Sequence, residues 1–355
     1  MKSLVKPIER VVAALTYKDP DRVPAAPLVC GASRRVYGVT YDVWSRDPVI
    51  AAKSLIAAQE LIGFDGFLTL VDLSVEPAAF GQKVLYPVES TALSAAFKGD
   101  MLIKSVDDYD KLEYVDPKKA DRMRDVIKIC EILVQAKGKE VPTLGFVYGP
   151  AGTLSMMRTL EKLSLDLVKN KSAVLKGLKI VNDVLFDYAK AQCETGVPGV
   201  VLDVLYASKM IWSRKTYDEF EGQLCSKIAD EIRKHNALVV LHNCGHGPFF
   251  DTMISWYKPA AISFHYVPDD CKDYADTKEK YGKKTVLIGQ ADNPKVIYPG
   301  TPEEVMNHCA EQIKVYGPGS GFILATGCEF PPNASLLNAR AMIEAAEKYG
   351  KYPMA

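Results

Sequence analysis

The sequence of 355 residues lacks an excess of either charge, a long apolar segment and a compact set of paired cysteines. Its 44 Lys and Arg residues balance 44 Asp and Glu residues, so no basic surplus indicates a nucleic-acid-binding protein. Hydrophobic residues make up 48% of the chain, more than a disordered chain carries. No apolar run reaches the roughly 18 residues of a membrane-spanning helix. These absences leave the class of soluble globular proteins.

The N-terminal segment and the cysteines together indicate the compartment. Pro7, Glu9 and Arg10 interrupt the apolar stretch that a secretory signal would need near the N-terminus. The eight cysteines are scattered through the chain. In a chain without an export signal they are expected to be free thiols or metal ligands. We therefore expect a cytoplasmic protein.

Short β-branched runs alternate along the chain with longer amphipathic stretches. The predicted strands are Val23–Leu28, Gly66–Val71, Thr143–Tyr148, Gly199–Val204, Ala237–His242, Ala260–Phe264, Thr285–Ile288 and Phe322–Ala325. The predicted helices are Pro48–Ile62, Asp121–Ala136, Ser164–Glu194, Thr216–His235, Tyr274–Tyr281, Pro302–Tyr316 and Ser335–Tyr349. Eight strands alternating with helices predict an α/β fold, the (β/α)₈ TIM barrel. The main alternative is a doubly wound open sheet, but neither GxGxxG nor GxxxxGK[ST] follows an early strand.

The length of the chain fits one barrel with two additions. We expect a single domain over residues 1–355, with an N-terminal helical extension before the first strand. Residues 82–111 fit poorly as one crossover between strands. Their runs KVLYPV and MLIKSV flank the turn signal Lys98-Gly99-Asp100, which predicts a small hairpin insertion.

Polar residues gather where the predicted strands end, which is where TIM barrels place their chemistry. They are Asp72 and Glu76 after the second strand, Tyr148 after the third, Asp203 and Tyr206 after the fourth, His242 and Cys244 after the fifth, His265 after the sixth, Gln290 after the seventh, and Cys328 and Glu329 after the eighth. Any one of them could be a structural polar group. Two cysteines and two histidines on one rim are less easily explained in that way.

His242, Cys244 and Cys328 form the strongest candidate site. His242 and Cys244 stand two residues apart on extended backbone, so their side chains point to the same side. One imidazole and two thiolates would bind Zn²⁺ and leave the fourth tetrahedral position open, as in catalytic zinc sites. His246, in the sequence GHG, is an alternative ligand. In the structural alternative, both cysteines are buried small hydrophobes and His242 caps a strand.

These residues belong to a set of motifs that resembles the uroporphyrinogen decarboxylase superfamily, and more closely its corrinoid-dependent methyltransferase branch, which includes methylcobamide:coenzyme M methyltransferases. The motifs are Asp21-Arg22-Val23-Pro24, Asp72-Leu73-Ser74-Val75-Glu76, Gly149-Pro150, His242-Asn243-Cys244-Gly245, Gly289-Gln290-Ala291-Asp292 and Gly327-Cys328-Glu329-Phe330-Pro331-Pro332. The HxCG and GCxxPP motifs are the specific part. The resemblance implies a TIM barrel in which His242, Cys244 and Cys328 hold zinc.

The chain departs from the decarboxylases themselves at two places. Their arginine-rich MRQAGR segment is absent from the stretch between Leu28 and Arg35, and their C-terminal GHG is replaced by Gly327-Cys328-Glu329. The resemblance therefore implies methyl transfer rather than decarboxylation of a polyanionic tetrapyrrole, with a metal-free decarboxylase as the alternative and a non-catalytic corrinoid-binding module as a further one.

For methyl transfer the expected cofactors are Zn²⁺ and a corrinoid co-substrate. The corrinoid would arrive on a partner protein or free, because no histidine lies in a DxHxxG-type corrinoid-binding motif. The other substrate is a thiol or a small methylated donor, with coenzyme M mildly favoured. The expected site contains two further groups. Asp72, Glu76, Asp203 and Glu329 are predicted to orient the substrate or the metal ligands, and Tyr148, Tyr206, His265 and Gln290 are predicted to line the pocket.

Overall fold

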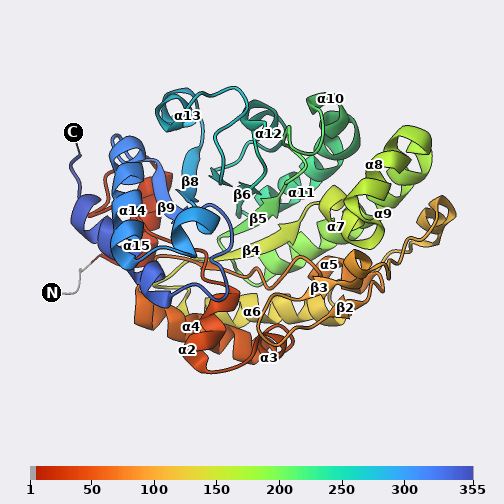
Figure 1. Ribbon diagram of the computed structural model, residues 1–355, viewed down its shortest axis with the longest axis horizontal. Coiled ribbons are helices and arrows are strands. Elements are labelled where there is room, and N and C mark those ends of the chain that lie inside the picture. Colours follow the sequence, from red (N-terminus) through yellow and green to blue (C-terminus); the bar gives the residue numbers. More distant parts are fainter. Residues whose placement is uncertain (1–4, 355) are drawn as a thin grey trace.

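The computed structural model describes residues 5–354, and its centre is a curled sheet of seven parallel strands (Figure 1). In spatial order the strands are β1 (Phe67–Leu68), β4 (Thr143–Tyr148), β5 (Gly199–Asp203), β6 (Leu238–Asn243), β7 (Ala261–Phe264), β8 (Val286–Ala291) and β9 (Phe322–Thr326). The remaining strands, β2 (Val84–Leu85) and β3 (Leu93–Ser94), form a separate antiparallel pair. The predicted TIM-barrel-like α/β fold is confirmed.

The sheet is accompanied by α-helices, most of which cover its outer face (Figure 1). They are α1 (Pro7–Leu15), α2 (Arg34–Tyr37), α3 (Tyr41–Trp44), α4 (Pro48–Ile62), α5 (Val75–Ala79), α6 (Asp121–Lys137), α7 (Pro150–Arg158), α8 (Leu160–Lys169), α9 (Lys171–Glu194), α10 (Arg214–Tyr217), α11 (Gln223–Lys234), α12 (Phe250–Tyr257), α13 (Tyr274–Tyr281), α14 (Pro302–Tyr316) and α15 (Leu336–Tyr349). The strands β5, β7, β8 and β9 are buried along their whole length, as expected when both faces of a parallel sheet are covered.

The predicted first strand, Val23–Leu28, is the one strand of the eight that does not form a regular ladder. Pro24 and Pro27 have no N–H to donate, so the segment makes only isolated bonds. The amide of Leu324 donates to the carbonyl of Pro24 at 2.9 Å, and the amide of Ala26 donates back to Leu324 at 2.8 Å. On the other side, the amide of Asp65 donates to Ala25 at 2.9 Å. The segment thus lies between β9 and β1 and closes the barrel.

The inserted hairpin is confirmed, but its second strand lies earlier than predicted. Val84 and Leu85 pair with Ser94 and Leu93, so the connecting loop is formed by residues 86–92. The turn signal at residues 98–100 instead ends a short 3₁₀ helix, where Gly99 adopts a φ of +89°. Glycine is common where a helix ends with a positive φ, and it is common in tight turns for the same reason. The glycine signal alone therefore does not distinguish a helix end from a hairpin turn.

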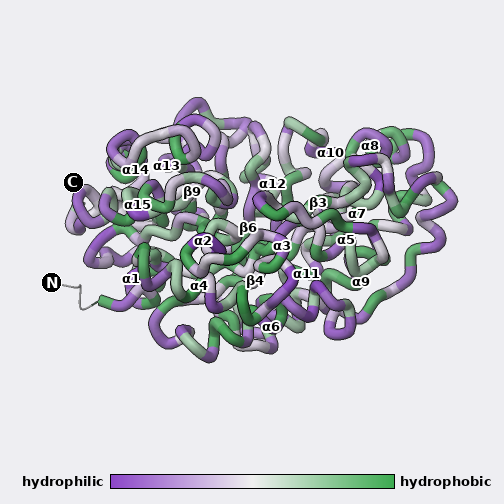
Figure 2. The backbone as a smooth tube through the Cα atoms, turned by 60° about the horizontal axis from the view of Figure 1, so that its bottom comes forward, coloured by the Kyte–Doolittle hydropathy of each residue, from purple (hydrophilic) through white to green (hydrophobic). Residues whose placement is uncertain are grey.

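Most predicted helices are confirmed, with some differences. The predicted helix Ser164–Glu194 is divided into α8 and α9 at Asn170. The predicted helix Thr216–His235 is divided into α10, a π-helical turn over residues 218–222 and α11. The helices α2, α3, α5, α7 and α12 were not predicted. Among the described residues no helix is both long and apolar enough to cross a membrane, and Figure 2 shows hydrophobic and hydrophilic residues interspersed along the helices.

The two ends of the barrel differ. Helix α1, the predicted N-terminal helical extension, lies against the N-terminal ends of the strands, and its Val11, Ala14 and Leu15 pack onto the inward-facing side chains. At the opposite end the strands give way to the βα loops that carry the candidate site residues. The bridge between Arg22 and Lys351 joins the two terminal regions, which lie near each other in Figure 1.

Candidate metal centre at the barrel mouth

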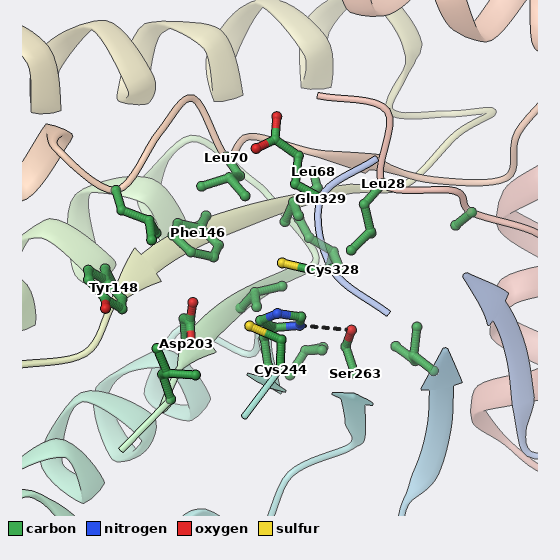
Figure 3. Close-up of a pocket in the computed structure, with 18 of the residues that line it drawn as sticks. Leu28, Leu68, Leu70, Phe146, Tyr148, Asp203, Cys244, Ser263, Cys328 and Glu329 are labelled. Atoms are coloured by element: carbon green, nitrogen blue, oxygen red, sulfur yellow. Dashed lines mark hydrogen bonds between the residues drawn. The ribbon is translucent and has the colours of Figure 1, made fainter. Parts of the chain in front are cut away.

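His242, Cys244 and Cys328 come together at the carboxyl ends of β6 and β9. One ligand atom from each side chain, an imidazole nitrogen or a sulfur, lies within 4.8 Å of the others. Ligands around a tetrahedral Zn²⁺ are separated by about 3.5–3.8 Å, so small side-chain movements would complete such a site. Figure 3 shows the sulfur atoms of Cys244 and Cys328 beside the ring that is bonded to Ser263. The donor set therefore fits a zinc ion.

Ser263 fixes the orientation of His242. The register of the sheet places Ser263 of β7 directly beside His242 of β6, and the Ser263 hydroxyl lies 3.0 Å from His242 Nδ1. A hydrogen bond at Nδ1 leaves Nε2 free for a metal, which is the usual arrangement around metal-binding histidines. Burial lowers the pKa of His242, but hydrogen bonding to Cys328 and the charge of Asp203 raise it overall above its ordinary value.

The two thiols interact directly. The hydrogen bond from Cys244 lowers the pKa of Cys328 well below its ordinary value, and the neighbouring His242 acts in the same direction. The same hydrogen bond raises the pKa of Cys244, and burial adds to the effect. The pair thus favours one thiolate next to one thiol. Thiolates are the ligands that soft or borderline cations such as Zn²⁺ prefer.

Two carboxyl groups flank the three ligands. Asp203 ends β5 in register with His242, and burial raises its pKa to about 7 although His242 opposes this shift. Its Oδ1 has no hydrogen-bond partner within the described chain. Glu329 follows Cys328 directly and accepts a hydrogen bond from the amide of Gly31 at 3.1 Å, while burial raises its pKa to about 8. Both residues line the same cavity as the ligands (Figure 3).

Asp72 and Glu76, the other two predicted acidic site residues, are engaged with the protein. Both carboxylate oxygens of Asp72 accept hydrogen bonds from Arg122, at 2.9 and 2.6 Å. Glu76 is buried in α5, and its Oε1 accepts the amide of Tyr148 at 2.9 Å. Asp72 lines the cavity as part of an ion pair. Glu76 does not line the cavity, and its hydrogen bond holds Tyr148 at the end of β4.

Tyr148 and Tyr206 lie where a pocket was predicted. Both are buried and line the cavity, and Tyr206 packs edge-on against Trp212 with ring centroids 4.6 Å apart. A Cβ added at Gly152 in α7 would collide with the ring of Tyr148. This contact explains the small residues at the start of α7, because they leave room for the tyrosine ring.

His265 and Gln290 lie beside the site rather than in the cavity. Gln290 donates from its side chain to the carbonyl of His265 at 2.7 Å and accepts from Tyr316 at 3.1 Å. The ring of His265 stacks on Tyr266 at 4.1 Å, and Tyr266 stacks in turn on His246 at 3.5 Å. His246 is therefore part of an aromatic stack and not of the ligand cluster.

Sequence reasoning missed three residues around the site: Ser263, Arg122 and Glu221. Ser263 is the one hydroxyl in the otherwise apolar strand β7, a signal that could have been used. Glu221 is buried behind the mouth and accepts the amide of Ala151 at 3.0 Å. Arg122 and Glu221 lie on helical segments that are distant in sequence from the residues they contact, and only the folded structure brings them to the site.

A cavity of about 550 Å³ opens from the ligand cluster into the barrel. Most of its wall is apolar and includes Leu28, Leu68, Leu70 and Phe146 (Figure 3). Its volume falls within the range of roughly 300–1,000 Å³ that is typical of small-molecule sites. The fold and the site thus define a TIM-barrel-like protein in which one histidine and two cysteines, a set that could hold a metal ion, lie beside a cavity of small-molecule size.

The chain belongs to the uroporphyrinogen decarboxylase (URO-D) family, whose model matches residues 6–349. It is 23% identical over 343 residues to the methylcobamide:CoM methyltransferase MtaA of Methanosarcina barkeri, covering 96% of this chain and 97% of the relative. It is 25% identical over 348 residues to the methylcobamide:CoM methyltransferase MtbA of Methanosarcina mazei, covering 97% and 98%. The uroporphyrinogen decarboxylase of Aliarcobacter butzleri is 24% identical over 328 residues, covering 86% of each chain.

A solved structure has the same fold over nearly the whole chain. It is a methyltransferase from Methanosarcina mazei, with a TM-score of 0.78 and 20% identity, covering 97% of this chain and 99% of that one. The family predicted from the sequence motifs is therefore confirmed, and its methyltransferase members are among the similar proteins.

Proposed function

We propose that this chain is a zinc-dependent methyltransferase that moves a methyl group between a corrinoid and a thiol or small methylated donor. The observation that carries the proposal is the cluster of His242, Cys244 and Cys328 at the open end of a small-molecule cavity. The similarity to methylcobamide:CoM methyltransferases over nearly the whole chain supports the same chemistry.

Three side chains would hold the zinc ion. His242 would bind through Nε2, because Ser263 occupies Nδ1, and Cys244 and Cys328 would bind through their sulfurs. Three protein ligands leave one tetrahedral position for a substrate heteroatom. When bound, zinc supplies Lewis acidity, which lowers the pKa of a thiol and polarises the heteroatom of a methylated donor.

In this proposal, Asp203 and Glu329 act on the substrate. Asp203 Oδ1 has no protein partner, so it can accept the proton that a substrate thiol releases. The thiolate then attacks the methyl carbon, the sulfur–carbon bond forms, and the cobalt–carbon bond breaks with its electron pair staying on cobalt as Co(I). In the reverse direction Co(I) attacks the methyl carbon of the donor, and Asp203 returns a proton to the leaving heteroatom.

The corrinoid would come from outside the chain, on a carrier protein or free in solution. It would meet the substrate at the mouth, where Tyr148 and Tyr206 line the cavity beside the metal ligands. A reducing cytoplasm suits this chemistry because both ligand thiols must stay reduced, and the eight cysteines are free in the structure.

Methylcobalamin turnover tests the proposal. Purified protein loaded with zinc is incubated anaerobically with methylcobalamin and candidate thiols, or with cob(I)alamin and phenyl methyl ethers, while the corrinoid absorbance is followed. The proposal requires about one bound zinc per chain and a substrate-dependent change in absorbance. A protein that binds no zinc and leaves the corrinoid spectrum unchanged with every substrate would not be a methyltransferase, and decarboxylation of porphyrinogens would be tested next.

A further inference from the structure

The interior of this barrel is hollow next to the metal centre. A TIM barrel is normally filled by layers of bulky branched side chains. Here β7 contributes the small residues Ala261 and Ser263 at its inward positions, and the closing segment contributes Ala26. The space that a larger side chain would fill joins the cavity. The cavity therefore continues from the ligands past Val240, which lies two residues before His242 on the same face of β6.

Among the described residues, the wall of the cavity contains no lysine or arginine. Its acidic members are Asp72, Asp203 and Glu329, and Asp72 is already neutralised by Arg122. Lys209 lies in a separate shallow depression with His246. An anionic group inside the cavity would lose its hydration and meet carboxyl groups rather than a cation, which makes its burial costly.

We infer that the substrate of this site is an uncharged molecule with an apolar aryl or alkyl body, and that this body lies inside the barrel while its heteroatom reaches the metal centre. The inference rests on the proposed methyltransferase function and names the class of its second substrate. An apolar, poorly hydrated cavity favours apolar ligands because water gains few hydrogen bonds there. A thiol that carries a sulfonate would place its negative charge against the same wall.

The test compares alkyl thiols that share a two-carbon link and differ only in their end group. The thiols are 2-phenylethanethiol, which is neutral, 2-mercaptoethanesulfonate, which is anionic, and thiocholine, which is cationic. Each is methylated by methylcobalamin on the zinc-loaded protein, and kcat/KM is measured. We expect the phenyl compound to exceed both charged thiols by about tenfold or more, which corresponds to roughly 1.4 kcal/mol. A higher kcat/KM for the sulfonate or for thiocholine would overturn the inference and leave the proposed function intact.

A second measurement keeps the two hypotheses apart. If no thiol is methylated and no phenyl methyl ether is demethylated, the proposed function fails, and calorimetric binding of 2-phenylethanol against ethanesulfonate then decides the preference of the cavity alone. Tighter binding of the alcohol supports an apolar ligand, whereas tighter binding of ethanesulfonate contradicts it.

A filling variant locates the apolar body. Val240→Phe places a ring in the space below His242, so the KM for 2-phenylethanethiol is expected to rise about tenfold while that for ethanethiol stays within about twofold. Val168→Phe makes the same change at a residue of α8 that is 84% exposed, and it serves as the control. Zinc content and melting temperature report whether the fold and the metal site are intact. Should Val240→Phe not fold, Ala261→Leu fills the same space from the neighbouring strand β7, where Ala261 pairs in register with Val240. An unchanged KM for the phenyl compound in a folded filling variant would place its body outside the barrel.

Discussion

At the scale of single residues, Cys328 is the proposed zinc ligand that follows β9, whereas His242 and Cys244 come from the end of β6. Cys328→Ser replaces a thiolate by a poor zinc ligand, so zinc content is expected to fall from about one equivalent to under about 0.2 after dialysis. Methylcobalamin turnover is expected to fall with it. Cys271→Ser, at a half-buried thiol outside the cluster, serves as the control. Full zinc retention in Cys328→Ser would remove Cys328 from the ligand set.

Ser263 gives a finer test of the same site, because it acts only through His242. Ser263→Ala removes the hydrogen bond to Nδ1 without touching a ligand, and zinc affinity is expected to fall about 10–100-fold. Competition with a chromophoric chelator measures this affinity. Ser263→Thr keeps the hydroxyl and should restore most of it, while Ser226→Ala on the surface of α11 should change nothing. Equal affinities for the alanine variant and the wild type would mean that Ser263 does not orient the ligand.

The convergence of His242, Cys244 and Cys328 could be predicted from the sequence, whereas their role as metal ligands stays a prediction. His242 and Cys244 stand two apart at a strand end, so the period of a strand alone aligns them. Cys328 joins them because another strand of the same barrel ends beside it. Ser263 and Arg122 make contacts across 21 and 50 residues of sequence. The hydroxyl of Ser263 in an apolar strand is a local signal, but no local pattern encodes the partner of either residue. Whether Asp203 and Glu329 act on substrate stays a prediction.

At the scale of elements, the Asp72–Arg122 pair ties the loop after β1 to helix α6. The Asp72 side chain has no exposed surface and that of Arg122 is 11% exposed, so removing one partner leaves a buried charge. Arg122→Met is expected to lower the free energy of unfolding by about 3–5 kcal/mol, measured by urea denaturation. Lys118→Met breaks the exposed pair with Glu194 and should cost less than about 1 kcal/mol. If Arg122→Met lowers the free energy of unfolding no more than Lys118→Met does, the Asp72–Arg122 pair does not stabilise the fold.

Elements were predicted well where one periodic signal dominates. The apolar runs of β4, β5, β6, β7 and β9 are bounded by turns and leave little choice of structure. The prediction of a regular strand at residues 23–28 was wrong because the prolines lack the N–H groups that a ladder needs. The apolar side chains of this segment still occupy a strand position. The boundary between α8 and α9 was not predicted, because both helices are amphipathic and only Asn170 separates them.

At the scale of the whole molecule, buried carboxyl groups make stability depend on pH. Burial raises the pKa of Glu221 to about 8 from its ordinary 4.5, and Asp203 adds to the effect while the Ala151 amide opposes it. Between these values the folded chain holds a proton that the unfolded chain has released, so the free energy of unfolding falls as pH rises. Each such group contributes up to about 1.4 kcal/mol per pH unit.

Glu221→Gln removes the contribution of Glu221, so the free energy of unfolding should fall less steeply as pH rises. The free energy of unfolding of the zinc-loaded protein is measured in urea at pH 5.5 and 7.5, and the difference is expected to be smaller in the variant by about 1–3 kcal/mol. Glu161→Gln, at an exposed position of α8, should leave the difference unchanged. An unaltered difference in Glu221→Gln would show that Glu221 does not titrate in this window.

The closing segment at residues 23–28 has a consequence for the breathing of the barrel. Its amides are held by single bonds, from Ala26 to Leu324 and from Ala25 to the Asp65 carboxylate at 2.8 Å, rather than by a continuous ladder. Such a seam opens at a lower free energy than the strands beside it, so its amides should exchange with deuterium before those of β4 and β5. Gly31, whose amide donates to Glu329, lies three residues after this segment. The cavity wall at Glu329 is therefore attached to the segment that opens at the lowest free energy.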